Sequence, residues 1–515
     1  RLYFAAHGTG EVPEGITYNF VPEGATGALG RLKVKGISAS KIKMQGFCWA
    51  LHKEPTLKDD FTAMGEKLYD YPGLIYVMEP LEPATEYYVR AFAMTTDNQV
   101  GYGQVRRIIT LPKGQCTWHY AYNGEEADNQ RLAAATEGAM YYYNNWTNIV
   151  NYGINVNFDP GDESAHCSYG GWMTVGPNAG YQKIGTVMHE SGHGIGQGQI
   201  WQWSWPELKG DTQWVPENLG EEDGGPTGGE IVNTTPGEGV WWQGERSNMM
   251  VYFLTDGRDF ANGDWGHCGP FGVNGAGADN GTRILYIANA LEIHGMGEDG
   301  MPPSGGSASP YYSFRSIDST LYYISNEAYG GGLQYLTETA TGALKSVKAS
   351  SDEVLKDSAY AWNIIFQPQT CYYLIRNAKS GKYFSFKSGT IKSTTIDAPG
   401  ASESFHLMPS RYYARFGKKD APVKHKGYWI VEGNRNVWCA PALEGATNGS
   451  VSTKTQVFEN KQTEQRWLLL TAAEARNLAN ELGSVDKEKL ERYIAGARDM
   501  LTVPHTDLSD GATAA

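Results

Sequence analysis

The segment Thr186-Val-Met-His-Glu-Ser-Gly-His-Gly-Ile-Gly-Gln-Gly198 decides how the central part of this chain folds. It places His189 and His193 four positions apart, with Glu190 between them. On a helix, residues at this spacing lie on one face, so both imidazoles can bind one cation while Glu190 accepts a proton from water. Zn²⁺ prefers such nitrogen ligands and keeps a position open for water. The segment therefore predicts a helix that carries a zinc site.

Signals on both sides of the motif set the limits of this helix. The run from Lys183 to Met188 can begin it, whereas Gly194, Gly196 and Gly198 disfavour a long continuation. The alternative is a chance occurrence of His-Glu-x-x-His. The start and stop signals around the motif favour the metal site.

Length and composition exclude several classes of protein. A chain of 515 residues is too long for one core and predicts about three or four domains. A net charge of -14 argues against a nucleic-acid surface. No window approaches the roughly 18 consecutive apolar residues of a transmembrane helix. The six cysteines are scattered singly, so they indicate neither a thiolate zinc site nor a disulfide pattern.

Residues 1–112 are predicted to form an all-β sandwich, because short β-rich runs alternate with turn signals. The segment Leu81-x-Pro83-x-Thr85-x-Tyr87, followed by an alternating strand, resembles the tyrosine-corner region of fibronectin type III modules. This resemblance implies a structural spacer.

Residues 113–304 are predicted to form an α+β domain. A helical run from Ala127 to Val150 is followed by a strand at 154–158, a strand at 171–175 and the metal helix. This order resembles the upper subdomain of the zincin metallopeptidases, particularly the metzincins, and implies a zinc metallopeptidase. The resemblance also implies that an edge strand pairs with the substrate backbone. That strand would consist of Trp172, Met173, Thr174 and Val175. The alternative is an ordinary core strand.

The third zinc ligand departs from the metzincin pattern HExxHxxGxxH. Gly196 matches the pattern, but Gln199 stands where the third histidine belongs, and a Gln amide oxygen is a weak ligand for zinc. His267 is the preferred third ligand, because residues 264–274 resemble a His-x-x-Pro-Tyr-Gly-Leu-Asn segment of secreted bacterial HExxHxxG proteins. Lesser candidates are Gln199, His166 and His294.

Two further site predictions concern the segment between the metal helix and His267. Residues 247–252 resemble a Met-turn, which implies that Met250 lies beneath the metal and that Tyr252 is a catalytic oxyanion donor. The alternative is a buried helix or strand. A nearby loop gathers oxygen ligands suited to Ca²⁺, although a solvated acidic turn is the alternative. Its residues are Asp256, Asp259, Asn262 and Asp264.

Residues 305–470 contain three β-rich units in tandem, which predicts a β-trefoil. The units begin with aromatic strands at Tyr311, Tyr372 and Tyr428, continue with strands near 321–323, 382–384 and 437–438, and end near Trp362, Phe405 and Trp467. The Gln465-Arg-Trp467 sequence resembles ricin-type lectin domains and implies carbohydrate binding; a spacer or a protein-contact surface is the alternative. Residues 471–515 are predicted to form a helical segment that opens with a Thr471…Glu474 capping box, followed by a polar tail.

Together these resemblances imply a secreted or cell-surface zinc metallopeptidase whose trefoil targets it to glycoproteins or glycans. Glu190 would act as base and then as acid in peptide-bond hydrolysis. The alternative is a non-catalytic carbohydrate-binding protein on a degenerate peptidase scaffold, which Gln199 keeps open. A third possibility is a zinc hydrolase of esters or acyl groups. The expected substrate is a protein or glycoprotein, with no nucleic acid and no transmembrane segment.

Overall fold

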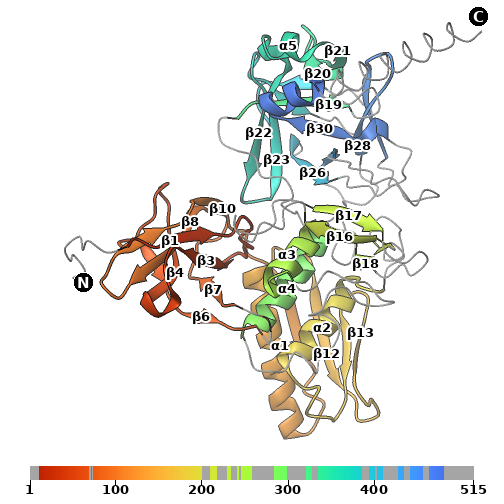
Figure 1. Ribbon diagram of the computed structural model, residues 1–515. Helices are drawn as coiled ribbons and strands as arrows, with labels where there is room; N and C mark the ends of the chain where they lie inside the picture. The colour runs from red at the N-terminus through yellow and green to blue at the C-terminus, as the bar shows by residue number, and fades with distance from the viewer. Residues whose placement is uncertain are drawn as a thin grey trace, which may run out of the picture.

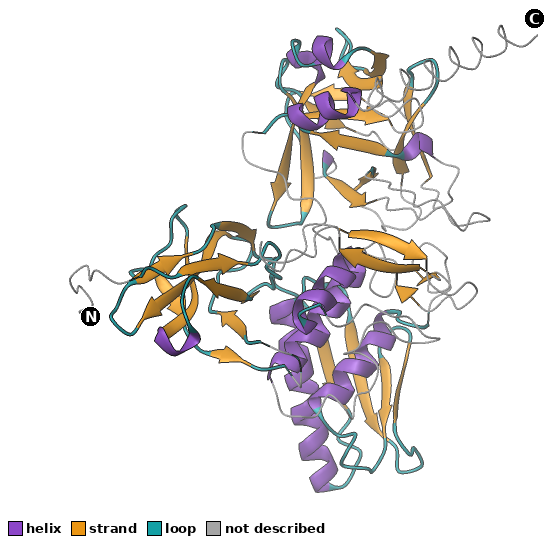
Figure 2. Ribbon diagram, in the orientation of Figure 1, coloured by secondary structure: helices purple, strands orange, loops and turns teal. Residues whose placement is uncertain are grey.

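The computed structural model shows a multidomain protein with a β-sandwich, a central α+β domain and a trefoil-like β region (Figure 1). The structure describes residues 11–68, 71, 73–199, 209–210, 212–216, 229–233, 241–242, 245–257, 283–298, 320–326, 334–385, 394–400, 403–409, 427–433, 441–455 and 463–480. Long helices belong to the central domain, whereas the other two domains consist mainly of strands (Figure 2). None of the described helices is long and apolar enough to cross a membrane.

The N-terminal domain is an antiparallel β-sandwich. One sheet has the strand order β10-β8-β4-β5 with β9 beside β8, a second has the order β2-β7-β6, and β1 pairs with β3. The strands are β1 (Glu14–Thr17), β2 (Ala28–Gly30), β3 (Leu32–Lys35), β4 (Ile42–Ala50), β5 (Asp60–Thr62), β6 (Gly65–Glu66), β7 (Ile75–Met78), β8 (Glu86–Thr95), β9 (Val100–Tyr102) and β10 (Arg106–Ile109), with a short 3₁₀ helix η1 at Ala39–Lys41. Alternate residues such as Phe47, Trp49 and Val89 point inward and form the core.

The expected tyrosine corner is present in this sandwich. Tyr87 lies at the start of β8, and its hydroxyl oxygen accepts a hydrogen bond from the backbone N–H of Glu82 at 3.0 Å. This bond ties the strand back to the turn before it, as in fibronectin type III modules. The prediction of a fibronectin-like sandwich is therefore confirmed.

The central domain contains a four-stranded sheet with the order β11-β12-β14-β13, in which β13 is antiparallel to β14 and the other pairs are parallel. Helices α1, α2 and α4 pack against one face of it around a core that includes Met140, Tyr143, Val156 and Met173. The elements are β11 (Thr117–Tyr120), α1 (Glu126–Trp146), β12 (Gly153–Phe158), β13 (Ala165–Ser168), β14 (Trp172–Val175), α2 (Ile184–Ile195), β15 (Lys209–Gly210), β16 (Thr212–Pro216), β17 (Gly229–Asn233), β18 (Trp241–Trp242), α3 (Glu245–Thr255) and α4 (Arg283–Glu298).

Helix α3 corrects the expectation of a Met-turn. Residues 247–252 lie inside this helix, where Met250, Val251, Phe253 and Leu254 are buried. A helix with so many buried apolar side chains is a packing element. The alternative of a buried helix therefore holds.

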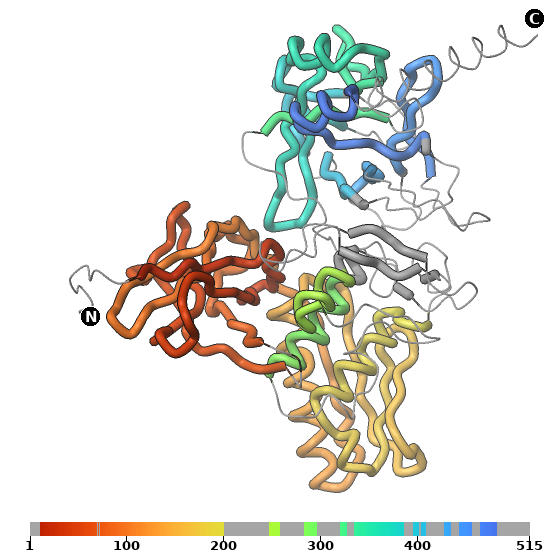
Figure 3. Tube along the Cα trace, viewed as in Figure 1, coloured from red at the N-terminus to blue at the C-terminus, as the bar shows by residue number. Residues whose placement is uncertain are grey.

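The sandwich packs directly on α3, so it is more than a spacer (Figure 3). The buried guanidinium of Arg31 donates from Nη2 to the carbonyl oxygen of Leu254 at 2.7 Å, and it lies 5.7 Å from the centre of the Phe253 ring. The hydroxyl of Tyr18 donates to Oδ1 of Asp256 at 2.9 Å. These contacts satisfy the C-terminal end of α3 with groups from the sandwich.

The C-terminal β region has the strand pattern of a trefoil. Strands β19, β22, β23, β26, β27 and β30 pair in a closed ring, and three hairpins, β20–β21, β24–β25 and β28–β29, extend from it. The elements are β19 (Tyr322–Asn326), β20 (Gln334–Glu338), β21 (Leu344–Lys348), α5 (Ser351–Val354), η5 (Ser358–Tyr360), β22 (Ala361–Gln367), β23 (Tyr372–Asn377), β24 (Tyr383–Ser385), β25 (Thr394–Ile396), β26 (Phe405–Pro409), β27 (Tyr428–Glu432), β28 (Pro441–Gly445), β29 (Val451–Thr455), η7 (Thr463–Gln465) and β30 (Trp467–Leu470). Residues 472–480 continue as a helix behind the expected capping box, in which the Glu474 N–H donates to Thr471 Oγ1 at 3.3 Å.

The internal repeat is visible in equivalent buried side chains. The indole N–H of Trp362 donates to Leu336 O, and that of Trp467 donates to Leu443 O, both at 3.0 Å. The first unit differs from the expected order of strands. Residues 321–323 were expected to form its second strand, but they lead into β19, which is a strand of the closed ring. The expected strands at 311–315 and 437–438 lie outside the described residues.

A buried histidine in the trefoil predicts a pH dependence of its stability. Burial lowers the pKa of His406 from 6.5 to about 3, although a backbone hydrogen bond with Gly433 acts in the opposite direction. The unfolded chain therefore binds a proton below about pH 6.5 that the folded chain excludes. We expect the free energy of unfolding to fall with decreasing pH between about 6 and 4, with up to about 1.4 kcal/mol per pH unit from this residue.

Urea unfolding at several pH values checks this expectation. His406→Gln should reduce the slope in that pH range, whereas His119→Gln should leave it unchanged, because His119 is exposed. An unchanged slope in His406→Gln would contradict the assignment.

Candidate metal centre

Helix α2 brings the two predicted zinc ligands together. His189 and His193 have ring centroids 5.0 Å apart, with an angle of 84° between the ring planes. Both side chains are half-buried, while Val187, Met188 and Ile195 on the same helix are buried in the core. The expected helix and the shared face of its histidines are therefore present.

A backbone carbonyl fixes the orientation of the second imidazole. His193 Nδ1 lies 2.7 Å from the carbonyl oxygen of Gln197, just beyond the end of α2. A hydrogen bond to a carbonyl requires the proton on Nδ1, which leaves the lone pair of Nε2 for a cation. This is the arrangement that a metal-binding histidine needs.

Glu190 is a buried carboxyl group with an altered pKa. Burial is the main cause that raises its pKa to about 8, the charge of Asp162 adds to the shift, and a hydrogen bond from the Cys167 backbone acts against it. A cation held by the neighbouring histidines would favour the charged form. The carboxyl group thus lies between α2 and β13.

Two glycines allow this helix to sit close to the sheet and to end there. A Cβ atom on Gly194 would lie 2.4 Å from the Tyr152 hydroxyl and 3.2 Å from Gly171 Cα. Gly196 has a φ of 137°, a conformation that L-residues rarely adopt, and its N–H donates to the carbonyl oxygens of Gly192 and His193. These positions explain the glycine-rich end of the motif by packing and helix termination.

The expected edge strand is not at the edge. Strand β14, which contains the predicted substrate-binding residues Trp172, Met173, Thr174 and Val175, lies between β12 and β13. Among the described strands, β13 pairs with β14 alone. Residues 165–175 form a hairpin, in which β13 lies outside β14. Because β13 has only four residues, its sequence pattern was too short to predict this strand.

The structure separates the candidates for a third ligand. His267 lies outside the described residues. Gln199 is exposed in a turn, and His294 is buried on α4. His166 is next to Cys167, which faces α2, so His166 points to the opposite face of the sheet and pairs with Asp162 at 2.8 Å. Within the described residues, no three His, Cys, Asp or Glu side chains could hold a metal ion together.

The two remaining predictions are the catalytic role of Tyr252 and the calcium loop. Their described residues lie near the sandwich, and the others lie outside the described residues. The ring of Tyr252 packs against Gly257, and this residue makes a small contribution to the raised pKa of Tyr18 in the sandwich. Asp256, expected in a calcium loop, accepts the hydrogen bond from Tyr18. The other expected calcium ligands, Asp259, Asn262 and Asp264, lie outside the described residues. The roles of Tyr252 and of this loop stay predictions.

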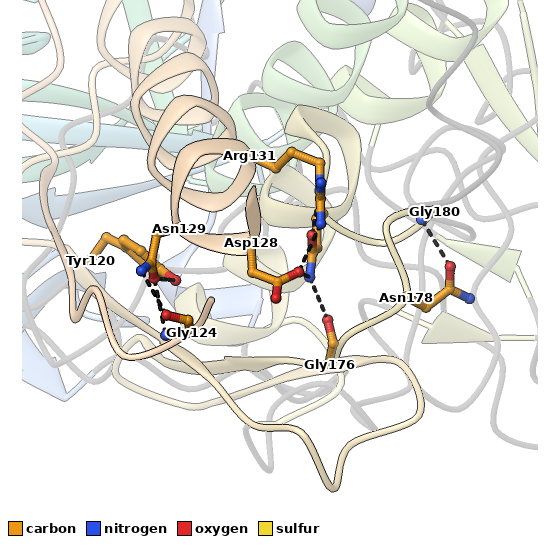
Figure 4. A network of polar contacts seen from close by, with 9 residues as sticks. Tyr120, Gly124, Asp128, Asn129, Arg131, Gly176, Asn178 and Gly180 are labelled. Atoms are coloured by element: carbon orange, nitrogen blue, oxygen red, sulfur yellow. Dashed lines mark hydrogen bonds and ion pairs between the residues drawn. The ribbon is translucent and has the colours of Figure 1, made fainter. Parts of the chain in front are cut away.

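A partly buried polar cluster that the sequence did not indicate fixes the loop before α2 (Figure 4). The Gln182 amide nitrogen donates to Asp128 Oδ1 and to Gly176 O, both at 2.9 Å, while Arg131 Nε donates to Gln182 Oε1 at 2.6 Å. Arg131 also donates from Nη2 to Asp128 Oδ1 at 2.7 Å. Asp128, in the first turn of α1, joins that helix to the loop before α2.

A second set of bonds in the same view closes the loop before α1 (Figure 4). The Asn129 side chain accepts from the Tyr120 hydroxyl at 2.7 Å and donates to Gly124 O at 2.7 Å. Both sets of bonds connect residues that are distant or irregularly spaced in sequence. No periodic signal could have found them.

No protein-family model and no curated protein matches this chain. Among solved structures, it is similar to a GlcNAcα1-4Gal-releasing endo-β-galactosidase from Clostridium perfringens, with 15% identity over 30% of this chain and 32% of that chain, and a TM-score of 0.23. The Rhizoctonia solani agglutinin aligns with 15% identity over 31% of this chain and 99% of that chain, and a TM-score of 0.22. A fibronectin type III domain of human fibronectin type III domain containing protein 3 aligns with 17% identity over 21% and 90%, and a TM-score of 0.15.

Likeness at this level says nothing of activity. The aligned part also spans only about a third of the galactosidase, as the 32% coverage shows. The site must therefore be interpreted from its own residues.

The cluster around Gln182 predicts a selective loss of stability. In Gln182→Glu, a carboxylate would face Asp128 and the Gly176 carbonyl in a buried site, so we expect the free energy of unfolding to fall by about 2–4 kcal/mol. The matched control is Gln130→Glu, because the Gln130 amide also donates to a carboxylate, that of Glu126, but on an exposed surface. The control should cost at most about 0.5 kcal/mol. Equal effects in chemical denaturation would contradict a structural role for the cluster.

Proposed function

We propose that this protein is a zinc-dependent hydrolase of peptide bonds. The observation that carries the proposal is the constellation on α2: two imidazoles on one face with a centroid separation of 5.0 Å, beside the buried carboxyl group of Glu190. A helix that only packed in a core would have no need of these three polar groups on one surface. A zinc hydrolase needs all three.

The donor set fits zinc. His189 and His193 would supply two nitrogen ligands, and the carbonyl of Gln197 sets the tautomer of the second. We propose His267 as the third ligand. When bound, zinc supplies a Lewis acid that lowers the pKa of water to about 7.

The residues of this chain would then bind the substrate and move the proton. Glu190 accepts the proton from water and returns it to the leaving amine. Strand β13 would pair with an extended peptide by β-addition through the outer backbone groups that Glu190 leaves available, the role first expected of Trp172–Val175. The hydrogen bond from the Cys167 backbone connects that strand to Glu190, so the edge and the base lie together.

The trefoil-like region suggests which molecules the protein binds and where it acts. We propose that the trefoil-like region binds glycans and brings the enzyme to protein or glycoprotein substrates outside the cell, at the surface or after secretion. The closed ring of six strands with three hairpins supports the lectin-like fold on which this rests.

A non-catalytic carbohydrate-binding protein is the second candidate. The observation that favours it is the pair of histidines without a third metal-binding side chain among the residues that the structure describes. The amide of Gln199 in place of a histidine points the same way. The metal content of the protein separates the two candidates.

We expect about one zinc per chain by elemental analysis, and hydrolysis of casein-type substrates that fails in the metal-free protein. Glu190→Gln should keep the zinc and lose about 10²–10⁴-fold in kcat/KM, because the group that moves the proton is gone. His193→Ala should lose the zinc itself.

The third ligand is tested in the same assay. His267→Ala should lower the zinc content, whereas Gln199→Ala should retain it. A wild-type protein that takes up no zinc would overturn the hydrolase proposal and favour the second candidate.

A further inference from the structure

The central sheet has one face that the helices cover and one that they leave open (Figure 2). Val156, Met173 and Cys167 lie next to one another across three strands and point into the core with α1 and α2. Because side chains alternate along a strand, their sequence neighbours point to the other side. That side carries Asn155, Trp172 and Ser168.

The side chains of the open face form two rows across the sheet. The strand register places His119 beside Asn155, Asn155 beside Trp172, and Trp172 beside Ser168. Three strand spacings make this row about 14 Å long. Asn157, Thr174 and His166 form a second row behind it, and His166 pairs with Asp162 at the outer end of this row. We call these seven residues the open face.

Trp172 is the large aromatic residue of the open face, and it is exposed to solvent. Its side chain is 59% exposed, although Met173 and Val175 on the same strand are fully buried. Tyr169, three positions earlier in the turn between β13 and β14, is 45% exposed. One exposed hydrophobic residue would be ordinary, but two exposed aromatic residues so close in the chain offer flat apolar surface to a ligand.

The chemistry around the indole indicates what it binds. The open face contains amide, hydroxyl and imidazole groups; none of its seven residues is Lys, Arg, Asp or Glu, and the Asp162 carboxylate at its outer end pairs with His166. A flat aromatic ring covers the apolar C–H face of a sugar ring, while amides and hydroxyls hydrogen-bond the sugar hydroxyls. A nucleic acid needs basic side chains, and a protein interface would place more apolar groups around the tryptophan.

We propose that the open face binds an uncharged glycan chain, with Trp172 stacking on a sugar ring and Asn155 and Ser168 on either side of it. The net charge of -14 disfavours an acidic glycan. This site is separate from the metal helix, because α2 packs on the opposite face. It is also separate from the trefoil-like region, and it does not depend on zinc or on hydrolysis.

The test uses the full chain and a defined set of probes: cellohexaose, xylohexaose, mannohexaose and hexa-N-acetylchitohexaose in isothermal titration calorimetry. At least one should bind, and Trp172→Ala should weaken that binding by about 10-fold or more. The matched control is Trp118→Ala. Trp118 is 46% exposed on the same sheet, but its register partner is the buried Ile154, so it belongs to the other face.

Two further results decide the proposal. Asn155→Ala should weaken binding less than Trp172→Ala, with both variants retaining the wild-type melting temperature. Glu190→Gln should bind the glycan as the wild type does, which separates this site from the proposed hydrolase. A number of glycan-binding sites per chain that is the same in Trp172→Ala as in the wild type, binding lost equally in Trp118→Ala, or no binding by any of the probes would overturn the proposal.

Discussion

The close contact between the last turn of α2 and the sheet is the constraint on which the rest of the central domain depends. Gly194 has no side chain, so the helix backbone comes within van der Waals distance of Tyr152, Cys167 and Gly171. This approach brings the backbone of β13 to Glu190 and leaves both histidines half-buried at the edge of the core. A larger residue at this position would lift the helix from the sheet and separate the carboxyl group from the strand beside it. The spacing of the motif thus controls the geometry of the site as well as its chemistry.

Local patterns in the sequence were sufficient for much of the fold. The tyrosine corner, the helix that carries His189 and His193, the Thr471 capping box and the threefold β pattern all rest on residues close together in the chain. Contacts between distant residues were beyond such patterns. The position of β13 outside β14 depends on pairing between strands, and the Gln182 cluster joins residues that are 54 positions apart. Tyr252 and Met250 were placed by resemblance to a turn, and a helix occupies that place.

The two faces of the central sheet divide its chemistry. On the helix side, apolar packing holds two imidazoles and a carboxyl group at fixed positions, and desolvation alters the pKa of Glu190. On the other side, the polar residues Asn155 and Ser168 flank Trp172 in contact with solvent. Strands only a few residues long serve both sides, because successive side chains point in opposite directions. A substitution on one face therefore leaves the chemistry of the other face largely unchanged.

The bond between Arg31 and Leu254 has a consequence for the order of events on the ribosome. The two residues are 223 positions apart, so at about 5–20 residues per second the carbonyl that Arg31 needs is made roughly 10–45 s after Arg31 itself. During this time the sandwich can fold its own sheets, but the guanidinium group of Arg31 stays in contact with water. Desolvation of the charge then accompanies the docking of α3. The sandwich is in this way completed by a helix of the domain that follows it in the chain.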